Sequence, residues 1–155
     1  MSREQLVVER ARRAFQTGKS KPLKFRVHQL KSLHRFITER RKDIADAVKK
    51  DLNKSEHSTE LFETLGLEGE INVAVERLAD WAAPRPVEKS PLTILDEVYI
   101  QPEPLGVVLI IGAWNYPWAV TLQPLVGAIA AGTVVENAME VVLCVNNARV
   151  MNNLA

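Results

Sequence analysis

Residues 104–118 read Pro-Leu-Gly-Val-Val-Leu-Ile-Ile-Gly-Ala-Trp-Asn-Tyr-Pro-Trp, and this stretch decides the fold. Within it, residues 106–112 form a continuous apolar run bounded by glycines, which is typical of a strand covered on both faces in a parallel sheet. Residues 117–131 have helical spacing, and Gly132 is placed to end that helix. Residues 133–135 predict a second parallel strand. The order of strand, loop, helix and strand is the beginning of a βαβ unit.

The residues before this unit predict a helical region. Good helix formers run from about residue 3 to 17, where Gly18 is placed to end the first helix. Pro22 opens a second segment, whose apolar residues recur at helical spacing as far as Leu52. A third helix is predicted over residues 58–81, with one side that buries Leu61, Leu65, Ile71, Val75 and Leu78.

A proline-rich segment separates the helices from the βαβ unit. Pro84, Pro86 and Pro91 cannot continue a helix, because proline lacks the amide hydrogen and clashes with the preceding turn. Residues 92–101 contain β-branched residues in partial alternation and predict a strand. The predicted fold class is α/β, with N-terminal helices followed by the beginning of a Rossmann-like parallel sheet. The expected divisions of the chain are residues 1–82, 83–102, 103–135 and 136–155.

Composition indicates a globular protein. The chain has 155 residues, of which 46% are hydrophobic and 25% charged, and this balance is not that of a disordered chain. No apolar run is long enough to span a bilayer, and the charged first residues do not form a secretory signal. The single cysteine, Cys144, cannot form a disulfide within the chain, so we expect a reducing, cytoplasmic compartment.

The charges are distributed unevenly. Residues 1–50 carry 15 Lys and Arg against 5 Asp and Glu, and the remainder carries 5 against 14. A basic half can contact nucleic acid or an anionic membrane, can face the acidic half of the same chain, or can form solvated helix faces. No recognised nucleic-acid module surrounds the basic cluster at residues 40–42, so nucleic acid is not an expected partner. His28 and His34 lack the spacing of paired ligands on a helix, so no metal is expected.

Asn115 is the polar side chain that the predicted buried strand delivers to its carboxyl end. Ligands bind at the carboxyl ends of strands in open α/β sheets. A side-chain amide there can donate a hydrogen bond to a developing oxyanion, and such donors stabilise a transition state by about 2.7–4 kcal/mol. The aromatic residues Trp114, Tyr116 and Trp118 can wall an apolar pocket beside it. The alternative is that Asn115 caps the helix that follows.

A family resemblance favours the catalytic interpretation. The string EPLGVVLIIGAWNYPWAVTLQPLVGAIAAG, residues 103–132, resembles the start of the cofactor domain in class 3 of the aldehyde dehydrogenase family, and most of all the fatty aldehyde dehydrogenases. The segments LDEVYIQPEPLGV, WAAPRPVEKSPLTIL and ARRAFQTGKSKPLKFRVHQLKSLHRFI are similar to the same family. The resemblance covers about residues 3–132. Trp-Asn-Tyr-Pro after a Gly-Val-Val strand is a far more specific signal than a lone glycine motif.

The resemblance implies a reaction and a set of site residues. Family members oxidise aldehydes by attack of a thiol, transfer of a hydride to NAD(P), and hydrolysis of the thioester by water that a glutamate activates. Asn115 matches the asparagine whose amide stabilises the oxyanion of the thiohemiacetal. The nicotinamide side of the cofactor cleft is lined by the residues that match Ile111, Gly112, Ala113 and Trp114, and positions near the substrate tunnel match Tyr116 and Trp118.

The resemblance also implies an incomplete cofactor-binding domain. The helices before residue 82 match its outer helices, residues 103–135 match its βαβ start, and residues 92–101 match part of the arm used for dimer formation. Beyond Gly132 the sequence departs from the family pattern, in which a Lys-Pro-Ser-Glu element follows and holds the cofactor ribose. The glycine-rich cofactor loop, the general-base glutamate, the nucleophilic cysteine in its motif and the membrane-anchoring tail of the fatty aldehyde dehydrogenases are not found here either.

We therefore expect a truncated and inactive form, with NAD(P) binding a property of the family rather than of this chain alone. Cys144 lies among valines without the family motif, so it is expected to be a small buried residue rather than a nucleophile. Glu136 and Glu140 are expected to be solvated. The alternative function is a non-catalytic protein that pairs with a full-length aldehyde dehydrogenase in a dimer.

Overall fold

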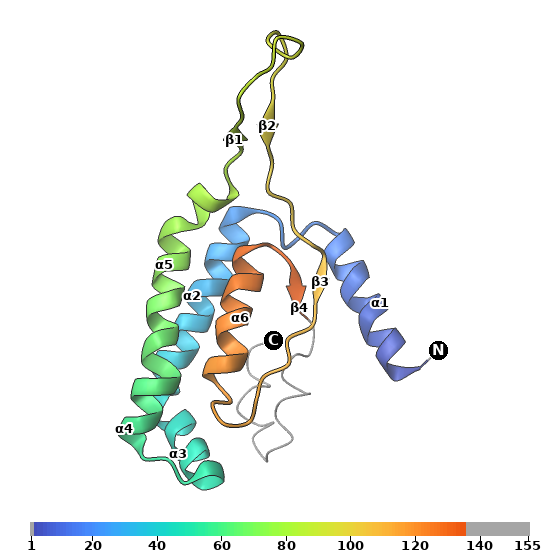
Figure 1. Ribbon diagram of the computed structural model, residues 1–155. Helices are drawn as coiled ribbons and strands as arrows, with labels where there is room; N and C mark the ends of the chain where they lie inside the picture. The colour runs from blue at the N-terminus through green and yellow to red at the C-terminus, as the bar shows by residue number, and fades with distance from the viewer. Residues whose placement is uncertain (1, 136–155) are drawn as a thin grey trace.

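Helices packed against a short parallel strand pair make up the part of the chain that the structure, a computed structural model, describes, namely residues 2–135 (Figure 1). The elements in chain order are α1 (Arg3–Gln16), α2 (Leu23–Glu39), α3 (Arg41–Leu52), α4 (Glu56–Thr59), the π-helical turn η1 (Glu60–Thr64), α5 (Leu65–Ala82), β1 (Arg85–Pro86), β2 (Tyr99–Ile100), β3 (Val107–Val108), α6 (Ala119–Ala130) and β4 (Val134–Val135).

The strands β3 and β4 pair in parallel, as the βαβ pattern predicted. Val107 pairs with Val134 and Val108 with Val135, and α6 forms the crossover between them. Figure 1 shows α1 on one side of this pair and α6 on the other, and both helices contact the strands. Gly132 ends the crossover with a φ of +75°, a conformation that favours glycine. The α/β fold class is confirmed.

The hydrophobic core lies between the helices rather than on the strands. Helices α2, α5 and α6 pack side by side, and α3 closes the lower end of the group (Figure 1). Apolar residues spaced three or four apart on each helix face the same interior, which is the pattern that buries one face of an amphipathic helix. The largest fully buried apolar side chains are Leu30, Ile37, Ile44, Leu67, Ile71, Leu78 and Leu122.

Helix ends follow the capping residues in the sequence. Ser2 caps α1, since its hydroxyl accepts from the Gln5 backbone N–H at 3.3 Å while the Gln5 side chain accepts from the Ser2 N–H at 2.8 Å. Gly18, at φ +72°, lies just beyond the end of α1, as predicted. Asn53 closes α3 in the left-handed region with a φ of 54°, and Ser55 caps the next helix.

The strand predicted over residues 92–101 is largely wrong. Only Tyr99–Ile100 is a strand, and it pairs antiparallel with Arg85–Pro86. The segment before it turns instead, because Thr93 and Ser90 hydrogen-bond each other through backbone and side chain, and such local bonds compete with a strand ladder. Residues 83–102, called the arm below, form a hairpin that projects from the top of the helices (Figure 1).

The covered strand predicted over residues 106–112 is also wrong in part. Ile110 is buried, but Leu109 is 67% exposed and Ile111 is 71% exposed. The described ladder pairs Val107–Val108 with Val134–Val135, and residue 135 is the last that the structure describes. One side of this strand end therefore faces solvent in the described part of the chain.

The third predicted helix is present, but with a different buried face. Ile71 and Leu78 are buried as predicted, whereas Leu61 and Leu65 are about half exposed. Leu61 lies within the π-helical turn η1, which holds one more residue than an α-helical turn, whereas Leu65 lies in α5 on a different side of the helix from Ile71 and Leu78. Leu67 takes the inward position instead.

The structure does not test the predicted divisions of the chain or the predictions for its tail. The divisions of the chain at residues 82, 102 and 135 stay predictions, and the tail with Cys144, Glu136 and Glu140 lies outside the described residues. Among the helices of residues 2–135, none combines the length and the apolar content needed to cross a membrane.

Truncating a core leucine tests the helical core. Leu78→Ala removes a fully buried side chain between α5 and its neighbours, so we expect it to lower the free energy of unfolding by about 2–5 kcal/mol. The matched control is Leu95→Ala at the tip of the arm, where the side chain is exposed and the change should stay within about 0.5 kcal/mol. Urea unfolding followed by circular dichroism measures both, and equal losses would contradict this packing.

Candidate functional site

The candidate site is the loop at residues 111–118, which connects β3 to α6. It leaves the carboxyl end of β3 and delivers its last residues to the first turn of α6. Asn115 lies in a turn of this loop and is exposed. Its side-chain amide has no hydrogen-bond partner within residues 2–135. The amide is therefore available to an external acceptor.

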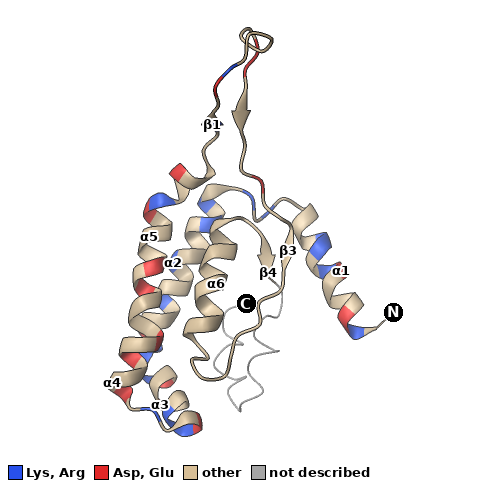
Figure 2. Cartoon of the chain, viewed as in Figure 1, with Lys and Arg blue, Asp and Glu red and all other residues tan. Residues whose placement is uncertain are grey.

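No charged residue occurs from position 104 to 135. Figure 2 shows the result, since β3, α6 and β4 lack the blue and red that mark the other helices. Any fixed charge at the loop must come from another element. Two charged side chains supply it, Lys54 from the α3–α4 connection and Glu63 from η1.

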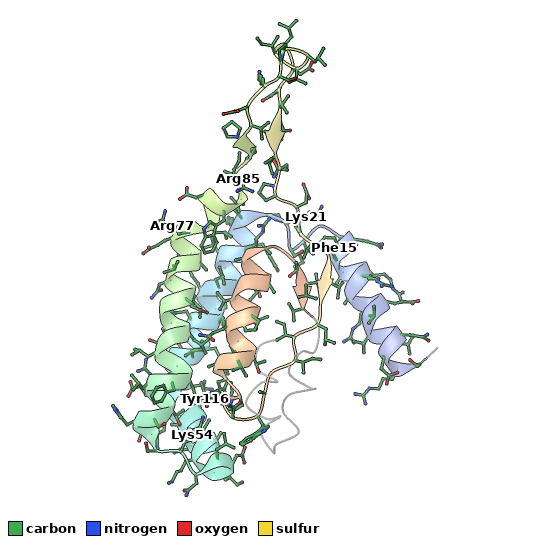
Figure 3. All side chains as sticks on the ribbon, viewed as in Figure 1. Phe15, Lys21, Lys54, Arg77, Arg85 and Tyr116 are labelled. Atoms are coloured by element: carbon green, nitrogen blue, oxygen red, sulfur yellow. The ribbon has the colours of Figure 1, made fainter. Side chains whose placement is uncertain are left out.

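Lys54 contacts the loop at its turn. Its ammonium donates to the Glu63 carboxylate at 2.9 Å and to the backbone carbonyl of Asn115. It also lies 3.7 Å from the centroid of the Tyr116 ring (Figure 3). A cation this close to an aromatic face is attracted by the negative face of the ring. One side chain thus binds two consecutive loop residues.

Glu63 contacts the loop at its other end. The second carboxylate oxygen accepts from the backbone N–H groups of Trp118, at 3.0 Å, and Ala119, at 3.2 Å. These are N–H groups at the start of α6, where a helix leaves donors unsatisfied and favours negative charge. The Glu63 side chain is 0% exposed, so it acts as a buried cap supplied from a distant element.

The π-helical turn places Glu63 in this position. Extra residues of this kind occur as single turns in helices and are frequent at functional sites. Arg41 at the start of α3 forms ion pairs with Glu60 at the start of η1 and with Glu68 in α5. These pairs tie the basic half of the chain to the acidic half on both sides of Glu63, one of the explanations left open for the uneven charge.

Gly112 lets the loop pack directly on α6. A β-carbon at this position would lie 2.3 Å from the hydroxyl oxygen of Thr121, far inside contact distance. The Thr121 hydroxyl is buried and has no hydrogen-bond partner in the described part of the chain. Close packing on the first turn of α6 therefore accounts for a glycine at position 112.

The three aromatic residues do not form one wall. Trp114 is 74% exposed. Tyr116 packs edge-on against Phe62, with ring centroids 6.4 Å apart. Trp118 is 4% exposed and lies in the helical core, 6.2 Å from the ring of Phe36. Trp118 thus anchors the loop in the core, and the roles of these residues toward substrate or cofactor stay predictions.

A pocket of about 480 Å³ lies elsewhere, at the base of the arm. Figure 3 places its residue Lys21 at the opposite end of the helices from Tyr116. The guanidinium of Arg26 donates to the carbonyls of Ala130, at 3.0 Å, and Lys21, at 2.9 Å, and burial lowers its pKa against the opposing effect of Glu103. No predicted site residue lines this pocket, so the loop remains the candidate site.

Sequence reasoning missed Lys54 and Glu63. Neither lies in a motif, and their partners are 61 and 55 residues away along the chain. The available signal was indirect, because a polar turn inside a long uncharged stretch must obtain its charged partners from another segment.

The comparisons with known proteins identify the family. Residues 3–144 match the aldehyde dehydrogenase family, which is most of the chain. The chain belongs to this family. The match includes residues 136–144 of the segment that was set apart as a divergent tail.

Individual aldehyde dehydrogenases agree with the family match. The chain is 54% identical over 131 residues to aldehyde dehydrogenase family 3 member A2 of Pongo abelii, covering 84% of this chain and 27% of that protein. It is 53% identical over 135 residues to the dimeric NADP-preferring aldehyde dehydrogenase of Canis lupus familiaris, covering 87% and 30%. The chain thus spans less than a third of the length of these curated relatives.

A solved aldehyde dehydrogenase has the same fold. All of this chain superposes on 34% of a substrate-bound Staphylococcus aureus AldH with a TM-score of 0.84 and 31% sequence identity. The resemblance to class 3 aldehyde dehydrogenases, first seen in residues 103–132, is confirmed.

Removing the buried carboxylate tests the site geometry. Glu63→Ala leaves two backbone N–H groups and the Lys54 ammonium without their partner, so we expect a loss of about 3–5 kcal/mol in the free energy of unfolding. Glu70→Ala is the control, because Glu70 is exposed on the next helix and should change the value by less than about 0.5 kcal/mol. Urea unfolding measures both variants, and a Glu63→Ala variant as stable as the control would refute the buried network.

Proposed function

We propose that these residues serve NAD(P)-dependent oxidation of aldehydes, fatty aldehydes among them, to carboxylic acids, in a cytoplasmic protein. Membership of the family supports the proposal. The observation that carries it is the exposed side-chain amide of Asn115 on a loop whose backbone is fixed from both ends. Residues 103–135 are then the start of the cofactor-binding domain, residues 1–82 its outer helices, and residues 83–102 its linker and arm.

Asn115 acts in this proposal as a hydrogen-bond donor to the reacting oxygen. Attack of a thiolate on the aldehyde carbon converts the carbonyl oxygen into an oxyanion, and an amide N–H aimed at that oxygen stabilises the charge. A donor with no competing partner keeps its hydrogen bond for the substrate. The Asn115 amide meets this condition within residues 2–135.

The strand end beside Asn115 suits the nicotinamide side of NAD(P). Ile111 and Trp114 are largely exposed, and Gly112 and Ala113 between them add little bulk, so the segment presents an uncharged apolar surface to a flat ring. When bound, NAD(P) would supply the acceptor for the hydride that leaves the substrate carbon. The residues of this chain bind one face of the ring and exclude water from it, and Tyr116 and Trp118 keep their proposed places toward the substrate side.

A chimaera tests the role of Asn115. Residues 3–135 of this chain replace the matched segment in the dimeric NADP-preferring relative, which supplies the rest of the enzyme. We expect Asn115→Ala in this chimaera to lower kcat by about 10²–10³-fold with little change in KM, because the amide acts on the transition state. Gln123→Ala removes an exposed amide from the same segment and should leave kcat unchanged. A fully active Asn115→Ala chimaera would refute the assignment.

A second function is pairing with a full-length aldehyde dehydrogenase without catalysis by this chain. The projecting arm favours it, because Leu92 and Leu95 at its tip are 94% and 96% exposed. Exposed apolar side chains on a protruding segment are typical of an interaction surface. One relative is named as dimeric, which supports self-association in the family, and we propose that a homo- or heterodimer forms through the arm.

Co-purification with the dimeric relative tests this pairing. We expect the 155-residue chain to show no turnover of aldehydes alone, to be retained by the tagged relative, and to lose retention in the double variant Leu92→Asp and Leu95→Asp. Leu105→Asp is the control, since Leu105 is 90% exposed but lies outside the arm. Retention that survives the double variant, or turnover by the chain alone, would overturn this second function.

A further inference from the structure

The ammonium of Lys54 has its three donors directed at three partners. A lysine ammonium carries three N–H groups and no acceptor. In the structure these meet the Glu63 carboxylate, the backbone carbonyl of Asn115 and the face of the Tyr116 ring. The side chain is 19% exposed, so water reaches little of it. Lys54 therefore has one preferred position, and that position defines where the backbone of Asn115 lies.

Glu63 binds the end of the loop that leads into α6. One carboxylate oxygen binds Lys54 while the other accepts from the N–H groups of Trp118 and Ala119. Residues 115–119 are thus held at the carbonyl of their first residue, at the ring of the second and at the N–H groups of the last two. The side-chain amide of Asn115 is a polar group of this segment that the network leaves unbound within residues 2–135.

Two irregular features of the backbone place Lys54 and Glu63 beside the loop. Asn53, in the left-handed region, turns the chain at the end of α3 immediately before Lys54. The π-helical turn η1 carries Glu63, and Arg41 binds acidic residues on both sides of it. A stabilising core contact needs neither feature, since the regular helices α2 and α5 already pack through apolar residues.

We propose that Lys54 and Glu63 are positioning residues that fix the backbone of residues 115–119 and so aim the side-chain amide of Asn115. This inference rests on the proposed function of Asn115 as the donor to the oxyanion. It attributes the orientation of that donor to the ion pair between Lys54 and Glu63, which lie outside the loop. A donor held 2.7–3.1 Å from the developing charge must be fixed before the reaction, because reorganising it then would cost part of its effect.

A solely structural role predicts a different result. Loss of a stabilising contact speeds amide exchange throughout the chain when exchange requires global unfolding. Loss of a positioning contact adds a local opening of the loop, and exchange through this opening does not require global unfolding. The two roles are therefore separated by measuring the loop and the core in the same sample.

Nuclear magnetic resonance of the full 155-residue chain makes this measurement. In Lys54→Met we expect the N–H groups of Trp118 and Ala119 to exchange about tenfold faster, the equivalent of one hydrogen bond, and the Asn115 side-chain signals to shift. The amides of Ile37 and Leu78 in the core should exchange faster only through global unfolding, which low concentrations of urea accelerate, whereas the exchange of the Trp118 and Ala119 N–H groups should not depend on urea. Lys54→Arg should restore part of the protection, and Lys50→Met, at an exposed position on α3, is the matched control.

Catalysis in the chimaera links the network to Asn115. We expect Lys54→Met to lower kcat by about tenfold with KM little changed, and to have a much smaller effect when Asn115 is already alanine, since residues that act as a unit are not additive. An equal effect in both backgrounds, or uniform exchange in the full chain, overturns the positioning role. If Asn115→Ala itself leaves kcat unchanged, the proposed function fails, whatever the exchange data show for Lys54.

Discussion

The ion pair between the half-buried Lys54 and the buried Glu63 is the interaction on which the candidate site depends. Burying two charges costs solvation free energy, and the cost is offset only when both groups find complete sets of partners. Here the ammonium and the carboxylate satisfy each other, and the remaining donors and acceptors bind the backbone of the 111–118 loop. The pair joins three segments that are distant in sequence, so the loop geometry depends on the fold of the first 64 residues.

The core and the site use different physics. Apolar side chains on α2, α5 and α6 hold the helices together, and their contacts are tolerant of direction because the hydrophobic effect is non-directional. The loop needs a fixed direction, which hydrogen bonds and ion pairs supply. Trp118 links the core to the loop, since its ring lies in the core while its backbone N–H donates to Glu63. A rigid scaffold thus carries an exposed functional loop.

Local signals in the sequence predicted most of the fold. The glycine-bounded run before Asn115 indicated a strand, of which the structure contains Val107–Val108. The spacing after Pro117 indicated a helix, and Gly18 and Gly132 the ends of two helices, all of which the structure contains. The predictions failed where a tertiary or local contact overrode the pattern. Ser90 and Thr93 form a turn in place of the predicted strand, and Leu61 lies outside because helical spacing assumes a regular helix, which the π-helical turn interrupts.

The site was predictable in part for the same reason. The position of Asn115 follows from the chain order of strand and loop, and the structure places it in the loop between β3 and α6. The partners of the loop do not follow from chain order. Lys54 and Glu63 are two ordinary charged residues among 39 Lys, Arg, Asp and Glu side chains, and only the folded chain shows which of them are buried.

Because η1 holds an extra residue, the rotation of this helix about its axis affects the candidate site. At 3.6 residues per turn, each residue adds about 100° of rotation. Deleting a single codon ahead of Glu63 in this turn would restore regular winding without changing Leu67, Ile71 or Leu78, which keep their inward face. The same deletion would rotate the upstream segment relative to its neighbours and disturb the surroundings of the Glu63 carboxylate. Length variation at this turn therefore offers related chains a route by which activity diverges while the helical scaffold persists.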